Sequence, residues 1–191
     1  MLPDFQSGYI SILNSVGSHP LQLWACCTAA AGASVAAAAD RELGGAPVVE
    51  LRGPLRCCCI CCPPEPQRAL KITLPVIVLL VKNLNKLFSF EVQIYDSKNT
   101  KRRFRASNFQ KTTRIKPFLC AMPLRMDSGW VYVHLNLAEL TRKAFGTHYN
   151  YTSRVLIHSS CRLQRVFFSE QPFREEQLPD ELRLPLQETQ S

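Results

Sequence analysis

The side chains with the most chemical potential in this sequence are bases that cluster between Ser97 and Met126. Nine Lys or Arg residues and no Asp or Glu lie between those two positions. Such side chains bind anionic groups, and the planar guanidinium group of Arg can take a carboxylate through two parallel hydrogen bonds. The cluster therefore predicts a docking surface for an anionic partner. The residues that we expect to contact this partner are Lys98, Lys101, Arg102, Arg103, Arg105, Lys111, Arg114 and Lys116.

The spacing of these bases suits a β-strand, in which alternate side chains share one face. Lys101, Arg103 and Arg105 would line one face, and Arg102 and Phe104 the other. Three like charges in a row repel one another unless an anion meets them, so the row favours docking. Two alternatives remain open. The row could simply keep a sheet edge soluble, or it could bind nucleic acid, although no zinc finger, helix-turn-helix or RNP signature is present.

The nine cysteines do not suit a disulfide framework. Five of them fall between Cys57 and Cys62, and neighbouring cysteines rarely reach separate partners with good geometry. We therefore expect a reducing, intracellular environment. A zinc site would need Cys58 and Cys61 together with His158 and Cys161. Three further thiols compete beside the first pair, so ordinary structural roles are favoured and we predict no metal or cofactor.

Catalytic patterns are absent from the sequence. It contains no Gly-x-Ser-x-Gly, no phosphate-binding Gly loop and no metalloprotease helix. None of the four histidines has a carboxylate partner nearby in sequence. A nucleophilic pair such as Cys120 with His134 is conceivable, but two structural residues are the simpler interpretation. We predict that the protein is not an enzyme.

Net charge points to a polyanionic partner. The whole chain carries +8, and residues 170–191 hold six acids against two bases, so the remaining residues are more basic still. A membrane partner is not expected. No charged residue occurs between Phe5 and Ala39, but that stretch is rich in small residues and is interrupted by Pro20. The apolar run 74–81 is too short to span a bilayer.

Hydrophobic alternation predicts a mostly β fold. We expect an opening strand before a turn at 17–20, strands at 70–74 and 76–81, and a hairpin of 88–95 with 100–107 about the turn 96–99. Alternation also predicts strands at 131–137, 154–158 and 163–168. A short helix should span 138–145, capped by Asn136 and stopped by Gly146.

Many short strands and one brief helix favour a single-domain antiparallel β-sandwich or jelly roll. We assign residues 1–169 to this domain and residues 170–191 to an acidic, Pro-containing tail. The Ala- and Cys-rich segment 25–62 is mainly expected to form loops, with a possible strand at 48–51. We expect Trp130 to pack in the core.

Several separate stretches resemble the cilia- and flagella-associated protein 20 family. The central ones are Arg-Phe-Arg-Ala-Ser-Asn at 103–108, Thr-Thr-Arg at 112–114, Lys-Pro-Phe at 116–118 and Asp-Ser-Gly-Trp at 127–130. Further matches are Thr-Arg-Lys-Ala-Phe-Gly-Thr at 141–147, Arg-Val-Phe-Phe-Ser at 165–169 and Phe-Gln-Ser-Gly at 5–8. The resemblance covers residues 5–24 and 66–186. It leaves out 25–62, where family members carry a charged stretch.

The resemblance implies a specific role. Members are β-sandwich proteins of the ciliary or flagellar axoneme and basal body. They lie at the inner junction of doublet microtubules, where the B-tubule closes onto the A-tubule. It implies tubulin, the parkin co-regulated gene protein and other inner-junction proteins as partners, and neither nucleic acid nor membrane. Their shape is similar to carbohydrate-binding modules, which leaves glycan binding as an alternative by analogy of fold alone.

Overall fold

Two β-sheets pack face to face in the computed structural model of the chain, which describes residue 6 and residues 8–172. The first sheet has the order β11-β6-β13-β4-β3, with β1 also paired to β13, and the second has the order β2-β5-β12-β7-β8-β10-β9. The strands of the first sheet are β1 (Tyr9–Asn14), β3 (Ser34–Asp40), β4 (Ala46–Arg52), β6 (Val76–Asn83), β11 (Gly129–Asn136) and β13 (Cys161–Ser169). Those of the second are β2 (Ala25–Thr28), β5 (Cys58–Cys62), β7 (Ser89–Asp96), β8 (Lys101–Ser107), β9 (Arg114–Ile115), β10 (Leu119–Pro123) and β12 (Tyr149–His158).

This arrangement confirms the predicted β-sandwich. Every strand pair is antiparallel except β8 with β10, which run parallel. The core lies between the sheets, where alternate residues such as Leu79 on β6 and Phe104 on β8 are fully buried. No helix in the described part of the chain is long and apolar enough to cross a membrane.

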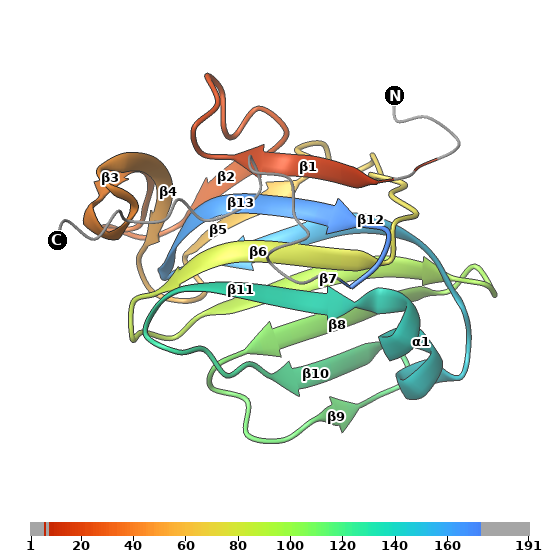
Figure 1. The fold of residues 1–191 in the computed structure, drawn as a ribbon. Coiled ribbons are helices and arrows are strands. Elements are labelled where there is room, and N and C mark those ends of the chain that lie inside the picture. Colours follow the sequence, from red (N-terminus) through yellow and green to blue (C-terminus); the bar gives the residue numbers. More distant parts are fainter. Residues whose placement is uncertain (1–5, 7, 173–191) are drawn as a thin grey trace, which may run out of the picture.

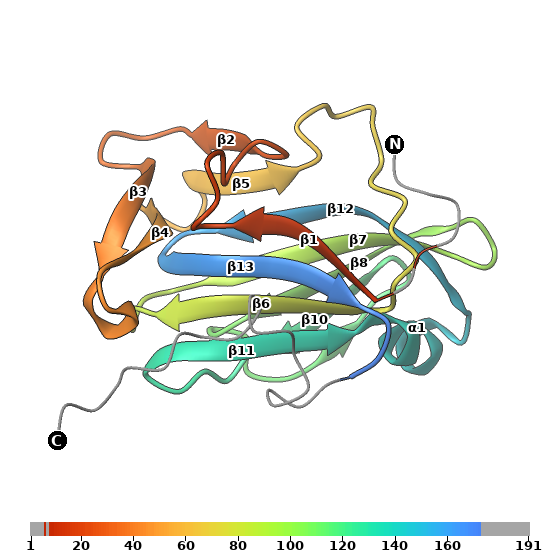
Figure 2. The same ribbon diagram turned by 45° about the horizontal axis from the view of Figure 1, so that its top comes forward.

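One α-helix, α1 (Leu137–Phe145), forms where it was predicted. Asn136 Oδ1 accepts a hydrogen bond from the N–H of Glu139 at 3.1 Å. Gly146 adopts φ 68°, and its N–H donates to the carbonyl oxygen of Arg142 at 3.0 Å. The two caps therefore fix both ends of the helix. Figures 1 and 2 show α1 at one end of the sandwich, with β3 and β4 at the other.

The predicted hairpin is confirmed as β7 and β8. Its turn is held by Asp96, whose Oδ1 accepts hydrogen bonds from the N–H groups of Lys98 at 3.0 Å and Thr100 at 2.9 Å. Asn99 takes the left-handed conformation that closes the turn, with φ 56°. The register that results places Glu91 opposite Arg105. The turn thus decides which side chains of the two strands face each other.

The expectation that residues 25–62 mainly form loops is wrong. This segment contributes β2, β3, β4 and β5, together with the 3₁₀ turn η1 (Arg41–Leu43), and only the strand at 48–51 had been anticipated. Ala has little β propensity of its own, but small side chains are tolerated in β3, which lies at the edge of its sheet. The cysteines of β5 alternate cleanly. Cys58 and Cys62 face the core, while Cys59 and Cys61 face outward.

Two further expectations are corrected. Residues 70–74 form no strand, only an isolated bridge between Ile72 and Thr152, because Lys71 adopts a positive φ of 54° that ends the extended run. Trp130 is not a core residue. It pairs with Lys82 on the outer face of the first sheet, and its neighbour Val131 points the other way.

That outer face carries an ionic cluster around Asp40, whose side chain is fully buried. Its carboxylate accepts hydrogen bonds from Arg162 Nη1 at 2.7 Å, Lys82 Nζ at 3.0 Å and Trp130 Nε1 at 3.1 Å. Burial opposes ionisation of Asp40, but these three donors outweigh it and lower its pKa to about 2. The cluster ties β3 to β6, β11 and β13.

Candidate functional site

Strand register brings five of the predicted docking residues onto one face of the second sheet. Arg105 on β8 lies opposite Ala121 on β10, and Ala121 lies opposite Arg114 on β9. One step along, Arg103 lies opposite Leu119, and the N–H of Lys116 donates to the carbonyl oxygen of Leu119 at 2.8 Å. We call this face the basic surface. It consists of Lys101, Arg103, Arg105, Arg114 and Lys116.

Among the described residues, one carboxylate, that of Glu91 on β7, lies against this surface. Its Oε1 is 3.3 Å from Arg105 Nη2 and 3.5 Å from Arg103 Nη1. The carboxylate side chain is 8% exposed, whereas the two guanidinium side chains are 42% and 40% exposed. Glu91 therefore relieves the repulsion between the two Arg residues from beneath, and it offsets part of their charge. The Glu91 carboxylate therefore supplies, within the sheet itself, part of the negative charge that the row of bases requires.

The other three bases of the surface keep their full charge. Lys101, Arg114 and Lys116 are exposed, and no carboxylate of the described residues pairs with them. Their positive potential is therefore directed at solvent. We expect these three side chains to dominate attraction of an acidic partner.

Arg102 does not belong to the basic surface. As alternation predicted, it points to the opposite face, where its Nε donates to Asp96 Oδ2 at 3.0 Å. The side chain of Asp96 is fully buried and that of Arg102 is 13% exposed. Burial opposes ionisation of Asp96, but hydrogen bonds from Thr100, Thr147 and Arg102 outweigh it and lower its pKa. Arg102 is thus already paired and is removed from the set of contact residues.

Arg102 instead positions the segment next to the basic surface. Its guanidinium group donates to the carbonyl oxygen of Pro117 and lies 5.7 Å from the centre of the Phe118 ring. It also lies 4.7 Å from the ring of Phe145 on α1. Phe118 is 61% exposed, and nearby Ile115 on β9 is 55% exposed. These two exposed apolar side chains lie on the same face of the sheet as Arg102, opposite the basic surface.

The remaining two predicted residues lie outside the strand rows. Lys98 is exposed in the turn between β7 and β8, and Lys111 is exposed in the loop between β8 and β9. Sequence reasoning missed Glu91 as part of this surface. The observed register is centred on Lys98 and places position 91 opposite position 105, whereas a hairpin centred on the predicted turn 96–99 would have placed it opposite position 104. No pattern in the sequence indicated the parallel pairing of β8 with β10.

The residues of the alternative zinc site and of the alternative catalytic pair do not lie close to one another. Alternation on β5 puts Cys58 in the core and Cys61 on the outer face, so the two cannot share one ion with His158 and Cys161. Among the described residues, no group of three or more His, Cys, Asp or Glu side chains is placed to hold a metal. Cys120 is buried between the sheets, whereas His134 is exposed on β11 of the other sheet. These two residues cannot act as a nucleophile and its base.

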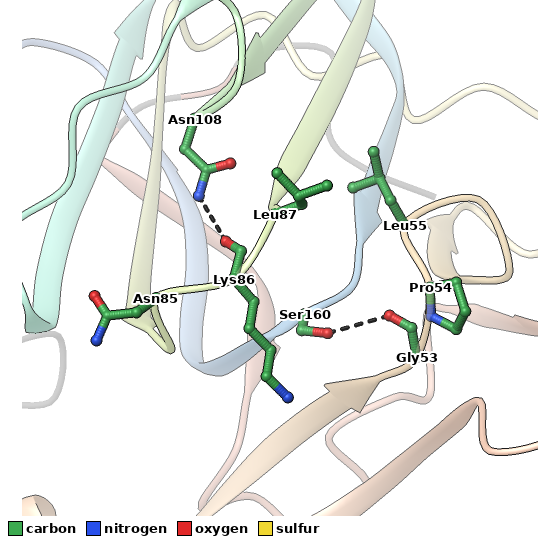
Figure 3. Close-up of a pocket in the computed structure, with 8 residues that line it drawn as sticks. All are labelled: Gly53, Pro54, Leu55, Asn85, Lys86, Leu87, Asn108 and Ser160. Atoms are coloured by element: carbon green, nitrogen blue, oxygen red, sulfur yellow. Dashed lines mark hydrogen bonds between the residues drawn. The ribbon is translucent and has the colours of Figure 1, made fainter.

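A hollow of about 560 Å³ lies where the loop after β4 meets the start of β7 (Figure 3). Two of its polar side chains already bond within the protein. Ser160 Oγ donates to the carbonyl oxygen of Gly53 at 3.2 Å, and Asn108 Nδ2 donates to that of Lys86 at 2.7 Å. None of its lining residues is aromatic, so it offers no stacking surface for a sugar ring. The basic surface remains the better candidate site.

Comparison with known proteins gives a consistent result. Residues 1–186 match the model of the CFA20 domain. Cilia- and flagella-associated protein 20 of Chlamydomonas reinhardtii is 46% identical over 188 residues, which covers 97% of both chains. The Caenorhabditis elegans protein of the same name is 47% identical over 183 residues, covering 95% of this chain and 89% of the relative. A solved exo-beta-agarase aligns with a TM-score of 0.42 at 6% identity, over 87% of this chain and 26% of the agarase.

Proposed function

The chain belongs to the cilia- and flagella-associated protein 20 family, and we propose that it is a non-enzymatic structural protein of the axoneme. Family membership makes it a protein associated with cilia or flagella. In this proposal it links the A- and B-tubules at the inner junction of doublet microtubules and supports ciliary stability and motility. Its partners are tubulin and, at the junction, the parkin co-regulated gene protein. This role is the one that the family resemblance implies.

The observation that carries the proposal is the charge on the basic surface. Five bases share one face of the second sheet, and Glu91 is the one carboxylate that pairs with them among the described residues. Tubulin is acidic, so such a surface would speed its encounter and orient the two proteins. Tight interfaces commonly combine an apolar or Arg-containing centre with a charged rim.

The test is co-sedimentation with microtubules. The variant neutralises the three unpaired bases by Lys101→Gln, Arg114→Gln and Lys116→Gln. Each exposed charge is expected to contribute about 0.5–1 kcal/mol, so affinity should fall roughly tenfold to a hundredfold. Salt should weaken binding of the unmodified protein, because a contact between exposed charges is screened. Binding that the triple variant retains in full would exclude this surface.

A matched control changes net charge equally but elsewhere. The bases Lys71, Lys86 and Arg142 are exposed outside the basic surface, and replacing all three with Gln should leave binding within about twofold. Equal losses in the two triple variants would mean that only net charge matters.

Glu91 provides a test with the opposite sign. Glu91→Gln keeps the shape of the side chain but frees Arg103 and Arg105 from their shared carboxylate. Binding to an acidic partner should then strengthen severalfold, from about 1 kcal/mol of added attraction. Weaker binding would mean that Glu91 orients the two Arg side chains productively rather than competing with the partner.

Nucleic acid is the competing polyanion. If RNA or DNA were the partner, the unmodified protein would shift an oligonucleotide band at physiological salt, and the triple variant would not. A shift confined to low salt would reflect charge attraction alone. A fluorescently tagged copy in a flagellated cell separates the two outcomes further. The proposal requires it to lie along the axoneme, and a nuclear or diffuse signal would overturn it.

A further inference from the structure

The strand β3 forms an edge of the first sheet that no other described strand covers. Among the described strands it pairs only with β4, over seven residues and without a bulge. Its residues from Ser34 to Ala39 include no charged side chain and no Pro, and most of them are exposed. Natural sheets normally protect such an edge with charges, Pro or a bulge. This edge carries none of these, in a protein whose net charge is +8.

The backbone groups that face outward can be assigned from one residue of the partner strand. Pro47 on β4 lies opposite Ala39 and has no N–H to donate. The ladder between the strands therefore runs through the alternating residues Ala36, Ala38 and Asp40. The N–H and C=O groups of Val35, Ala37 and Ala39 then point to the open edge. They form a row of donors and acceptors that suits one further strand.

A hollow lies between β3, β4 and the loop 18–22 that follows β1. It has a volume of about 540 Å³ and is lined in part by Pro20, Leu21, Ala37 and Val49. Ala37 and Val49 are paired across β3 and β4 on the core-facing side of the sheet. A strand added to β3 would turn every second side chain toward this side. Ala37 contributes only a methyl group to the lining of this hollow, so its volume is available to a large apolar side chain.

We propose that β3 is a docking site for an extended segment of another protein, which adds to the first sheet as a further antiparallel or parallel strand. The segment is uncharged and carries a large apolar side chain opposite Ala37, where the hollow receives it. Main-chain hydrogen bonds supply affinity and the hollow supplies selectivity, as in other cases of strand addition. A second copy of this chain is a poorer occupant, because its own β3 offers only Ser, Val, Ala and Asp side chains. The site belongs to the other sheet from the basic surface and does not depend on the axonemal role.

The experiment uses the full chain and a synthetic heptapeptide that alternates Thr and Leu. Alternate backbone nitrogens of the peptide are methylated, so that it pairs along one edge only and does not aggregate. Titration followed by NMR should shift the amide signals of Val35, Ala37 and Ala39. Ala37→Pro removes the outward N–H without removing a bond to β4. Loss of one or two hydrogen bonds, each about 0.5–1.5 kcal/mol, should weaken peptide binding by about twofold to a hundredfold.

Two controls decide the interpretation. Ala37→Ser keeps the N–H and the size of the side chain, so it should bind the peptide within about twofold of the original. Circular dichroism should be unchanged in both variants, because β3 keeps its ladder to β4. The proposal fails if the peptide does not bind, or if Ala37→Pro binds it as well as Ala37→Ser. It also fails if the protein dimerises through β3, seen as a concentration-dependent mass that Ala37→Pro abolishes.

Discussion

Replacing Asp96 by Asn should destabilise the protein strongly, because it leaves Arg102 without its partner inside the fold. Asp96 Oδ2 accepts from Arg102 Nε at 3.0 Å and from Thr147 Oγ1 at 2.8 Å. Asn can keep the two bonds of Oδ1 to the turn, but its NH₂ group would then face the N–H of Arg102. The Thr147 hydroxyl can rotate and accept, whereas a guanidinium N–H cannot.

The size of the effect follows from burial. Removing one member of a buried ion pair costs about 3–5 kcal/mol. Arg102 keeps its contacts with the rings of Phe118 and Phe145 and is 13% exposed, so we expect the lower end, about 3 kcal/mol. For a domain of this size each kcal/mol lowers Tm by about 2–4 °C. The expected loss is therefore about 6–12 °C, measured by calorimetry at pH 7.

A double-mutant cycle separates the ion pair from other effects. Arg102→Met removes the charge while keeping an apolar stem beside the rings. If the pair is coupled as its geometry implies, Asp96→Asn combined with Arg102→Met should cost about 1–3 kcal/mol less than the sum of the single changes. Additive losses would refute the reasoning. Glu139→Gln serves as the control, since its ion pair with Lys143 lies on the exposed face of α1, and it should not change Tm measurably.

Three further predictions concern stability and thiol reactivity. The pKa of Asp40 is lowered to about 2, so its ionised form contributes roughly 2 kcal/mol to the free energy of unfolding. This contribution is complete above the pKa of the unfolded chain, near 4, and is lost as pH falls toward 2. Acid unfolding followed by circular dichroism should show that the difference in stability between the original protein and Asp40→Asn disappears over that pH range. Burial raises the pKa of Cys62 to about 12, so iodoacetamide at pH 8 should label exposed Cys27 on the order of a hundredfold faster, and comparable rates would mean that β5 opens readily. Asn136→Ala should lower the free energy of unfolding by about 1 kcal/mol through loss of the helix cap, and an unchanged urea midpoint would show that packing alone fixes the start of α1.

The sequence predicted those elements whose signals are local. The hairpin of β7 with β8 was predictable because Asp96 and Asn99 are turn residues between two alternating runs. The helix was predictable from its two caps. Residues 25–62 were not, because Ala and Cys carry weak β preference and their strands are specified by pairing with β12 and β13, which lie roughly a hundred residues further along the sequence.

The candidate site was predictable only in part for the same reason. Alternation correctly placed Lys101, Arg103 and Arg105 on one face. Joining Arg114 and Lys116 to them required the parallel pairing of β8 with β10. The turn residues between these segments do not indicate whether β8 and β10 run parallel or antiparallel to each other.

Neighbouring bases on β8 have different roles, which a count of charges along the sequence does not distinguish. Arg102 is turned inward, where the field of buried Asp96 fixes it and it holds Pro117 and Phe118 in place. Arg103 is turned outward but shares Glu91 with Arg105. The attraction that a partner feels therefore depends less on the three consecutive bases 101–103 than on exposed bases from β8, from β9 and from the segment that follows β9. A surface of this kind presents charge in a fixed two-dimensional pattern that the order of residues along the chain does not reveal.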